Sequence, residues 1–248
     1  MIKFFRKIRQ NLLMENKTSK YFKYAIGEII LVVIGILIAL QINNWNENRK
    51  SLINEKATLT KFLQDLEADS TFFQFNNNRL KDINELHTDL YKIGLKDAKN
   101  ITLKEPNYIR RQLIYNPIAR ENNPDIASKL NDKTIRENVQ NYYRQMNDTE
   151  GSNVEFDAIV LKIRDFLRKK KIHKLSAWFE SKMNLGENSE TAPNVVLSES
   201  LEVLSKDEDF QQLLFESSIK SNELRVSLNI LIKDNVALME TIRTYIND

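Results

Sequence analysis

The sequence contains no cysteine among its 248 residues. This excludes disulfide bonds, thiol nucleophiles and cysteine-ligated zinc or iron–sulfur sites. Glycine and proline are also scarce, with 5 and 4 residues respectively. Because turn-rich β folds depend on these two residues, their scarcity favours helices. Strand patterns are weak throughout, so we expect an all-α fold.

Histidine is limited to His87 and His173. A carboxylate-bridged metal site on helices would place a Glu three residues before each His, but those positions hold Asn84 and Lys170. The surrounding patterns predict a half-buried packing role for His87 and a solvated position among lysines for His173. Neither a phosphate-binding glycine loop, a G-x-S-x-G motif nor a dinucleotide fingerprint occurs. We expect no enzymatic activity, no metal and no cofactor.

One long apolar run is present, YAIGEIILVVIGILIALQINNW at residues 24–45. The 12 residues from 29 to 40 have no polar side chain. A helix needs about 20 mostly apolar residues to cross a hydrocarbon core about 30 Å thick, and a lone strand would leave its backbone groups unpaired in lipid. Tyr21, Tyr24 and Trp45 lie where interfacial aromatic rings are expected. We predict a single transmembrane helix at residues 24–45.

A cleaved signal peptide is the alternative for this run. It would have a short basic head and an A-x-A-like cleavage site. Here 28 residues precede the uninterrupted apolar stretch. The stretch ends in Ala39-Leu40-Gln41, which does not match A-x-A. An uncleaved signal-anchor therefore fits better.

Charge predicts the orientation of this helix. Residues 1–28 hold seven basic and two acidic side chains, a net charge of +5, whereas the remaining 220 residues have a net charge of −2. Basic residues are retained on the cytoplasmic side of a membrane. We predict a single-pass protein of the inner (cytoplasmic) membrane, with a cytoplasmic N-terminus and a periplasmic C-terminal domain.

Two features inside the span have two interpretations each. One helix face holds Gly27, Leu31, Gly35 and Ala39, which recur every four residues. This spacing of small residues predicts a helix–helix contact in the membrane. The alternative is that the glycines only reflect how common glycine is in membrane helices. Glu28 is the one ionisable residue of the span. It either marks a functional site or reaches the membrane–water interface, because it lies only four residues from Tyr24.

Residues 1–23 form a basic head. On a helical wheel its apolar residues gather on one side and most of its basic residues on the other. This pattern predicts an amphipathic helix on an anionic inner leaflet. A disordered head that only sets the topology is the alternative.

The N-terminal sequence resembles a known family. The opening MIKFFRKIRQNLL and the following KYFKYAIGEIILVVIGILIALQINNWNENRK resemble uncharacterised single-pass membrane proteins of Bacteroidota, a family defined as a domain of unknown function. Asn116-Pro117 and the paired Tyr142-Tyr143 also suit the family pattern. The resemblance implies a membrane anchor and a helical outer domain, and it implies no activity.

After the span, apolar residues recur every seven positions. They are Trp45, Leu52, Leu59, Leu66, Phe73 and Leu80. The absence of proline and glycine from residues 43–93 predicts one long helix. A seven-residue repeat can form a coiled coil, but the partner positions include Glu55, Asp69 and Asn76. Packing against later helices of the same chain is therefore expected.

The remaining chain, to residue 248, predicts shorter helices framed by a last long one. We expect a connector at 94–107, a helical piece at 108–115 and a turn at 147–153, followed by a helix from 156 to 167 that can run on through Met183. Expected helix starts are Asn123 before Pro124, Asp132, Ser152 with Glu155, and Ser205 with Glu208. Residues 184–194 form a polar loop. We predict one antiparallel α-helical bundle domain at residues 46–248.

A basic stretch at residues 164–174, RDFLRKKKIHK, is the most distinctive feature outside the span. Its cations are Arg164, Arg168, Lys169, Lys170, Lys171 and Lys174. Such a patch suits an anionic partner or lipid headgroup, whereas a periplasmic location disfavours nucleic acid. The alternative is a solvated helix end favoured by the helix dipole.

These observations favour a membrane-anchored interaction or scaffold module of the cell envelope. Its expected partners are the bilayer and either a second copy or an envelope protein. Two alternatives remain: a ligand-sensing subunit without its own output domain, and an envelope enzyme whose site is assembled from scattered Asp, Glu, Tyr and Arg.

Overall fold

The computed structural model describes residues 18–96, 98–184 and 195–247. Helices dominate these residues, which contain one isolated β-bridge, between His173 and Val196, and no strand. The chain divides into two units, residues 1–57 and 58–248, and the boundary lies inside the longest helix, α2 (Thr18–Lys96). The predicted all-α class is confirmed.

In the first unit, α2 presents its apolar side chains outward. Leu31 is 67 % exposed and Ile34 50 %. Among the described residues α2 is the one helix long and apolar enough to span a membrane, and none of its most apolar 18-residue window is buried by the protein. Such a surface costs free energy in water and is stable in lipid. The head is described only from residue 18, so the amphipathic prediction for residues 1–17 lies outside the described residues.

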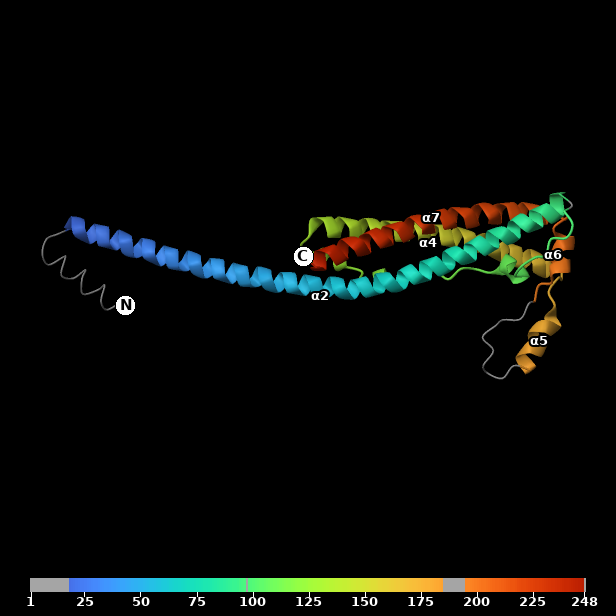
Figure 1. Ribbon diagram of the computed structural model, residues 1–248, viewed down its shortest axis with the longest axis horizontal. Coiled ribbons are helices and arrows are strands. Elements are labelled where there is room, and N and C mark those ends of the chain that lie inside the picture. The colour runs from blue at the N-terminus through green and yellow to red at the C-terminus, as the bar shows by residue number, and fades with distance from the viewer. Residues whose placement is uncertain (1–17, 97, 185–194, 248) are drawn as a thin grey trace. The chain divides into compact units, whose positions relative to one another are not determined.

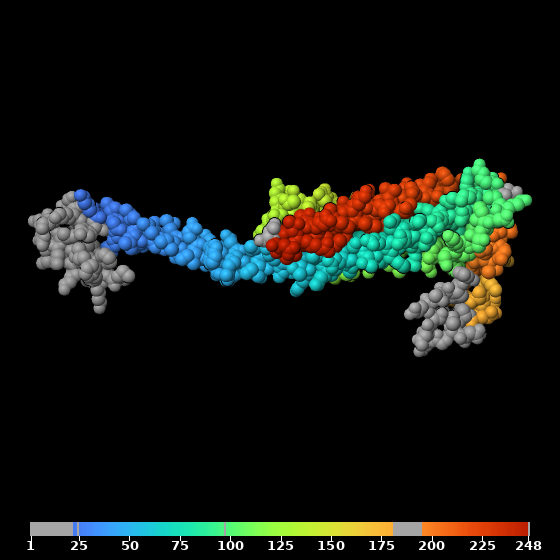
Figure 2. Space-filling view, viewed as in Figure 1, coloured from blue at the N-terminus to red at the C-terminus, as the bar shows by residue number. Residues whose placement is uncertain are grey.

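The second unit is built from three long helices. These are the part of α2 that begins at Thr58, α4 (Lys133–Lys169) and α7 (Glu208–Asn247). Figure 1 shows α7 running opposite to the other two helices, while α2 and α4 share one direction. Figure 2 shows α7 lying along α2 in this unit. The predicted bundle, with its first and last helices antiparallel, is confirmed.

Buried apolar residues form two clusters along the bundle. One contains Phe62, Phe73, Tyr142, Phe156 and Leu228. The other contains Leu90, Ile163, Leu201 and Phe210. Asn235 of α7 ties all three helices together, because its amide donates to Leu66 O of α2 at 3.1 Å and to Tyr142 Oη of α4 at 2.9 Å.

The seven-residue repeat of α2 becomes the core-facing stripe once the second unit begins. Leu59, Leu66, Phe73 and Leu80 are fully buried. The polar positions beside the stripe are buried as well: Asp69 is 1 % exposed and Asn76 4 %. These positions do not face a partner helix of a coiled coil. They hold the return segment, defined as residues 98–132, which leads back along the bundle from the end of α2 to the start of α4 (Figure 1).

Backbone groups of the return segment bond directly to α2. The Asp69 carboxylate accepts hydrogen bonds from Ile118 N at 2.7 Å and Ala119 N at 3.0 Å. The Asn76 amide donates to Ile114 O at 3.0 Å. Asp69 thus satisfies the free N–H groups at the start of α3 (Ile118–Asn122), which otherwise lack intrahelical acceptors.

The other short elements flank the bundle. The return segment also contains two 3₁₀ helices, η1 (Pro106–Arg110) and η2 (Ile126–Lys129). Helices α5 (Leu175–Asn184) and α6 (Ser198–Leu204) lie between α4 and α7 in sequence. The piece predicted as helical at 108–115 is helical only to Arg110, and Arg111 is already extended. The predicted loop at 184–194 lies outside the described residues after Asn184.

The predicted turn at 147–153 is wrong, because α4 continues through it. Met146, Thr149, Asn153 and Phe156 are buried at helical spacing, so packing maintains the helix across its polar, solvent-facing residues. The predicted capping box at Ser152 does not form. Its hydroxyl donates to Asp148 O at 3.2 Å, within the helix.

The expectation that this helix runs on through Met183 is also wrong. Helix α4 ends at Lys169, and α5 is a separate helix. Lys170 N and Lys171 N donate to the carbonyls of Phe166 and Arg168. Lys171 then adopts a φ of 56°, in the left-handed region that terminates helices.

Of the other predicted helix starts, one is confirmed. Asp132 Oδ1 accepts from Ile135 N at 2.8 Å and caps α4. Asn123 instead follows the end of α3, and η2 begins beyond Pro124. Asp207, rather than Ser205, caps the start of α7, with its Oδ1 accepting from Phe210 N at 3.1 Å.

Candidate functional site

The basic stretch at residues 164–174 falls at the end of α4, where it separates into two groups of side chains. Arg164, Arg168 and Lys174 line a cavity of about 530 Å³, which we term the basic cavity. Lys169, Lys170 and Lys171 are exposed and are not part of its lining. The structure therefore brings half of the predicted patch into a concave site.

The cations outside the cavity belong to ordinary surface interactions. Lys169 pairs with Asp165 at 2.6 Å, and Lys170 pairs with Asp207 at 2.6 Å. The Lys170 ammonium also lies 5.1 Å from the centre of the Phe166 ring. For these lysines the solvated, helix-end interpretation of the basic stretch holds.

The basic cavity is assembled from five segments. Its described lining comes from η1, the end of α4, the turn that follows it, α5, and residue 195. The lining residues are Arg110, Arg164, Asp165, Arg168, His173, Lys174, Leu175, Trp178, Phe179 and Val195. A second cavity of about 460 Å³ shares Arg110, Arg164, Trp178 and Val195 with it and adds Arg79 and Arg111. Positive charge therefore surrounds both hollows.

Backbone hydrogen bonds fix the walls of the basic cavity. The Asn107 Oδ1 accepts from Val195 N and Val196 N, both at 3.2 Å. Lys174 N donates to Val195 O at 2.9 Å, beside the bridge between His173 and Val196. These contacts join the return segment, the end of α4 and the approach to α6.

Arg164 is positioned by the return segment. Its Nε donates to Arg110 O at 2.7 Å, and its Nη1 donates to Gln112 Oε1 at 2.9 Å. Gln112 also hydrogen bonds to Asp157, whose Oδ1 accepts from Leu113 N at 3.4 Å. The Arg164 guanidinium is therefore oriented by a carbonyl and an amide rather than by a direct carboxylate partner.

Burial and neighbouring positive charge disfavour the charged forms of two side chains at the wall of the basic cavity. Burial, and secondarily the positive charge of Arg164, lower the pKa of Arg110. Burial and the charge of Arg110 lower the pKa of His173. The buried atoms Arg110 Nε and His173 Nε2 have no hydrogen-bond partner within the described structure. The prediction that His173 is a solvated neighbour of lysines is thus wrong, because the side chain is half-buried at the cavity wall.

Aromatic rings provide the apolar part of the lining. Trp178 is 42 % exposed and Phe179 59 %. Both come from α5, which begins immediately after the basic stretch. The cavity thus combines cationic donors with aromatic surface, a composition that suits recognition of organic anions.

His87 lies elsewhere, in the core between α2 and α7. It is 2 % exposed, and its Nε2 lies 3.3 Å from Ser217 Oγ. Burial lowers the pKa of His87 to about 4. The histidine is thus a packing residue, more deeply buried than predicted. Among the described residues no group of three or more His, Asp or Glu side chains is arranged to hold a metal ion.

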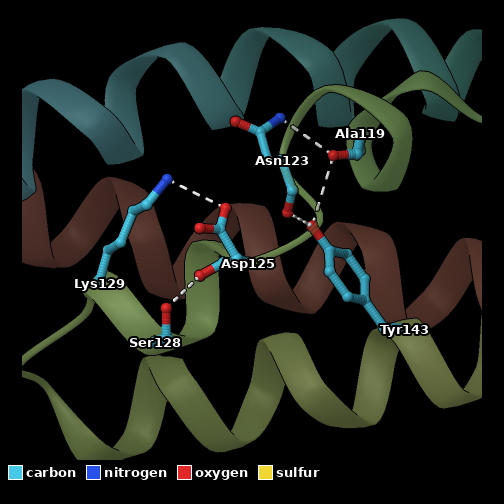
Figure 3. A network of polar contacts seen from close by, with 6 residues as sticks. All are labelled: Ala119, Asn123, Asp125, Ser128, Lys129 and Tyr143. Atoms are coloured by element: carbon cyan, nitrogen blue, oxygen red, sulfur yellow. Dashed lines mark hydrogen bonds and ion pairs between the residues drawn. The ribbon is translucent and has the colours of Figure 1, made fainter.

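The residues named by the family resemblance lie at α3 and in the adjoining core of the bundle. Tyr143 Oη donates to Asn123 O at 2.7 Å, while the Asn123 amide donates to Ala119 O at 3.0 Å (Figure 3). Tyr142 bonds to Asn235, and Pro117 precedes α3. The paired tyrosines therefore hold the return segment and the bundle together.

The small-residue face of the span stays a prediction. A Cβ added at Gly27 or Gly35 meets no atom within 4 Å, and Leu31 and Ala39 are exposed. The face is therefore sterically open to a neighbouring helix.

Arg110, Trp178 and Phe179 were not identified as site residues from the sequence. Arg110 lies 54 residues from Arg164, and only the path of the return segment brings them together. The one local signal is the proximity of the two aromatic residues to the basic stretch.

The comparisons with known proteins give a match to one family model and no activity. Residues 28–148 match the model of a family of unknown function, DUF6090. The match includes most of the apolar run, the return segment and the first part of α4. It states nothing about source organism, membrane topology or activity. No curated protein and no solved structure matches the chain.

Proposed function

We propose that this protein is a membrane-anchored helical interaction module of the bacterial cell envelope. The observation that supports this most directly is the apolar surface of α2, none of which is buried by the protein over its most apolar window. Such a surface needs lipid around it. The same helix continues into the second unit as a core element of the bundle, so the anchor and the folded domain share one element.

The proposed topology places residues 1–23 in the cytoplasm, residues 24–45 in the inner membrane and residues 46–248 in the periplasm. The excess of positive charge before the span supports this orientation. The resemblance of the N-terminal sequence to single-pass membrane proteins of Bacteroidota supports the single span.

The module acts by binding rather than by catalysis. Support comes from the polar groups that it buries. Asp69, Asn76 and Asn235 bond to backbone groups or neighbouring side chains of the fold. His87 is enclosed in the core. These residues stabilise the bundle.

Self-association is the partner interaction that we propose, through the face formed by Gly27, Leu31, Gly35 and Ala39. Small residues allow two membrane helices to approach closely. Gly35→Ile fills this face. Val33→Ile, on the opposite face, is the matched control.

Crosslinking of the full-length protein in membranes tests this proposal. The wild type and Val33→Ile are expected to give dimers, and Gly35→Ile is expected to reduce them severalfold. A protein that remains monomeric in membranes and in detergent, with no crosslinked partner, contradicts the interaction module. Dimers that are unaffected by Gly35→Ile contradict the proposed face.

A ligand-sensing subunit that signals through a separate protein is the second candidate. The basic cavity favours it, because concave sites of this size bind small molecules.

A further inference from the structure

We propose, beyond the interaction module itself, that the basic cavity binds a small organic anion. The acidic group of this ligand, a carboxylate or a phosphate, pairs with the guanidinium groups of Arg110 and Arg164. Its apolar body packs against Trp178 and Phe179.

Uncompensated charge is the first observation behind this assignment. Five lining residues are cationic or become so on protonation, whereas Asp165 is the one acidic residue in the described lining. Asp165 is already engaged by Arg168 at 2.5 Å and by Lys169 at 2.6 Å. It therefore leaves Arg110 and Arg164 without a direct carboxylate partner, and an anion in the cavity supplies the missing negative charge.

Unsatisfied donors at the same wall are the second observation. Arg110 Nε and His173 Nε2 are buried without a hydrogen-bond partner within the described structure. The positive charge of Arg164 disfavours the charged form of Arg110, and a buried charge without an opposite partner destabilises a protein unless something offsets the cost. Buried donors and charges that lack a partner are concentrated at the functional sites of proteins. A carboxylate or phosphate accepts several such hydrogen bonds at once.

The size and aromatic lining of the cavity decide between an inorganic and an organic anion. About 530 Å³ is far more space than a phosphate ion needs and lies in the range of small-molecule sites. Trp178 and Phe179 line this space with substantial ring surface exposed. Rings of this kind stabilise an apolar or aromatic ligand body through burial and stacking.

The lysines at 169–171 provide a comparison within the same basic stretch. They are exposed and lie outside the cavity lining. A site that recognised only an extended acidic surface would use these exposed cations. The proposed site uses the cavity-lining arginines, so the two sets of residues can be separated by mutation.

Binding to the full-length protein in detergent tests the proposal, with four probes: phenyl phosphate, benzoate, inorganic phosphate and the neutral benzyl alcohol. Calorimetry gives each Kd. The chain has two tryptophans, so a Trp45→Phe background makes Trp178 fluorescence a second, local readout. Arg110→Gln and Arg164→Gln remove the proposed contacts, and Lys162→Gln on the exposed side of α4 is the charge-matched control. Thermal unfolding of each variant separates lost binding from lost folding.

Phenyl phosphate or benzoate is expected to bind the wild type and Lys162→Gln equally and to perturb Trp178 fluorescence. Arg110→Gln is expected to weaken this binding roughly tenfold or more, because a charge-assisted hydrogen bond is lost. The tighter of the two aromatic probes identifies the acidic group. Absence of binding by both at millimolar concentration, or equal binding by both arginine variants and the control, overturns the site. Equal affinity for inorganic and phenyl phosphate overturns the role of the aromatic rings.

Discussion

Single buried polar residues hold the return segment against the bundle, and Asp69 makes two of these contacts. Its carboxylate accepts two backbone N–H groups of α3. In Asp69→Asn one oxygen is replaced by an NH₂ group that faces an N–H donor. We expect a loss of roughly 1–3 kcal/mol of stability, typical of a buried donor left unsatisfied.

Thermal unfolding of the full-length protein, followed by circular dichroism, measures this loss. Asp82→Asn is the matched control, because Asp82 lies on the same helix and is exposed. Its effect is expected to stay within about 0.5 kcal/mol. Equal unfolding midpoints for the two variants would show that Asp69 does not hold the return segment.

His87 predicts the pH dependence of stability. Its pKa in the folded protein is about 4, below the ordinary value of 6.5, because burial disfavours its charged form. Between these values the unfolded chain binds a proton that the native protein does not. Stability is therefore fully present above pH 6.5 and falls as pH decreases toward 4, by about 3 kcal/mol in all.

The variant His87→Leu removes this titration and keeps an apolar side chain in the core. Comparing the unfolding midpoints of wild type and variant at pH 7 and pH 5 cancels the contribution of the carboxylates. The wild type is expected to lose more stability than the variant on acidification. An identical pH dependence in both proteins would refute the assignment to His87.

At the scale of elements, the continuity of α4 through Gly151 predicts how a substitution at this glycine changes the stability of the protein. Gly151 is exposed in the interior of this helix, and an added Cβ meets no atom within 4 Å. Alanine there avoids the conformational entropy cost of glycine. Gly151→Ala is expected to stabilise the protein by about 0.5–1 kcal/mol in the same thermal unfolding assay.

Gly94, near the end of α2, is expected to show the opposite response to the same substitution. An added Cβ there collides with Ser205 O and with the Gln211 side chain. The backbone carbonyl cannot move away as a flexible side chain would, so Gly94→Ala is expected to destabilise. If Gly151→Ala destabilised as well, residues 147–153 would form the turn that the local sequence suggests.

Local sequence patterns predicted where helices form better than where they end. The repeat from Leu59 to Leu80 identified the buried stripe of α2 because its period matches the helix. The polar cluster at 147–153 suggested a turn, yet the buried Met146 and Phe156 keep the helix intact. Asn123 and Ser205 have capping chemistry, but their roles depend on contacts that form only in the folded bundle.

At the scale of the whole molecule, the helical bundle was predictable and the basic cavity was only partly so. The composition and the apolar periods indicated helices that pack on one another. The sequence also identified Arg164, Arg168 and Lys174 as members of a basic stretch. It did not identify Arg110 or the aromatic wall, because these join Arg164 only after the return segment has led back along the bundle. Contacts over 54 residues have no local signature.

The central claim, a periplasmic bundle anchored by the span, is tested most directly by cysteine accessibility. Because the chain has no cysteine, single variants on either side of the span, Ser19→Cys and Glu216→Cys, each introduce one labelling site. A membrane-impermeant maleimide is added to intact spheroplasts and, separately, to lysed ones. The proposed topology predicts labelling of Glu216→Cys before lysis and of Ser19→Cys only after it. The reverse pattern would place the bundle in the cytoplasm and contradict the account.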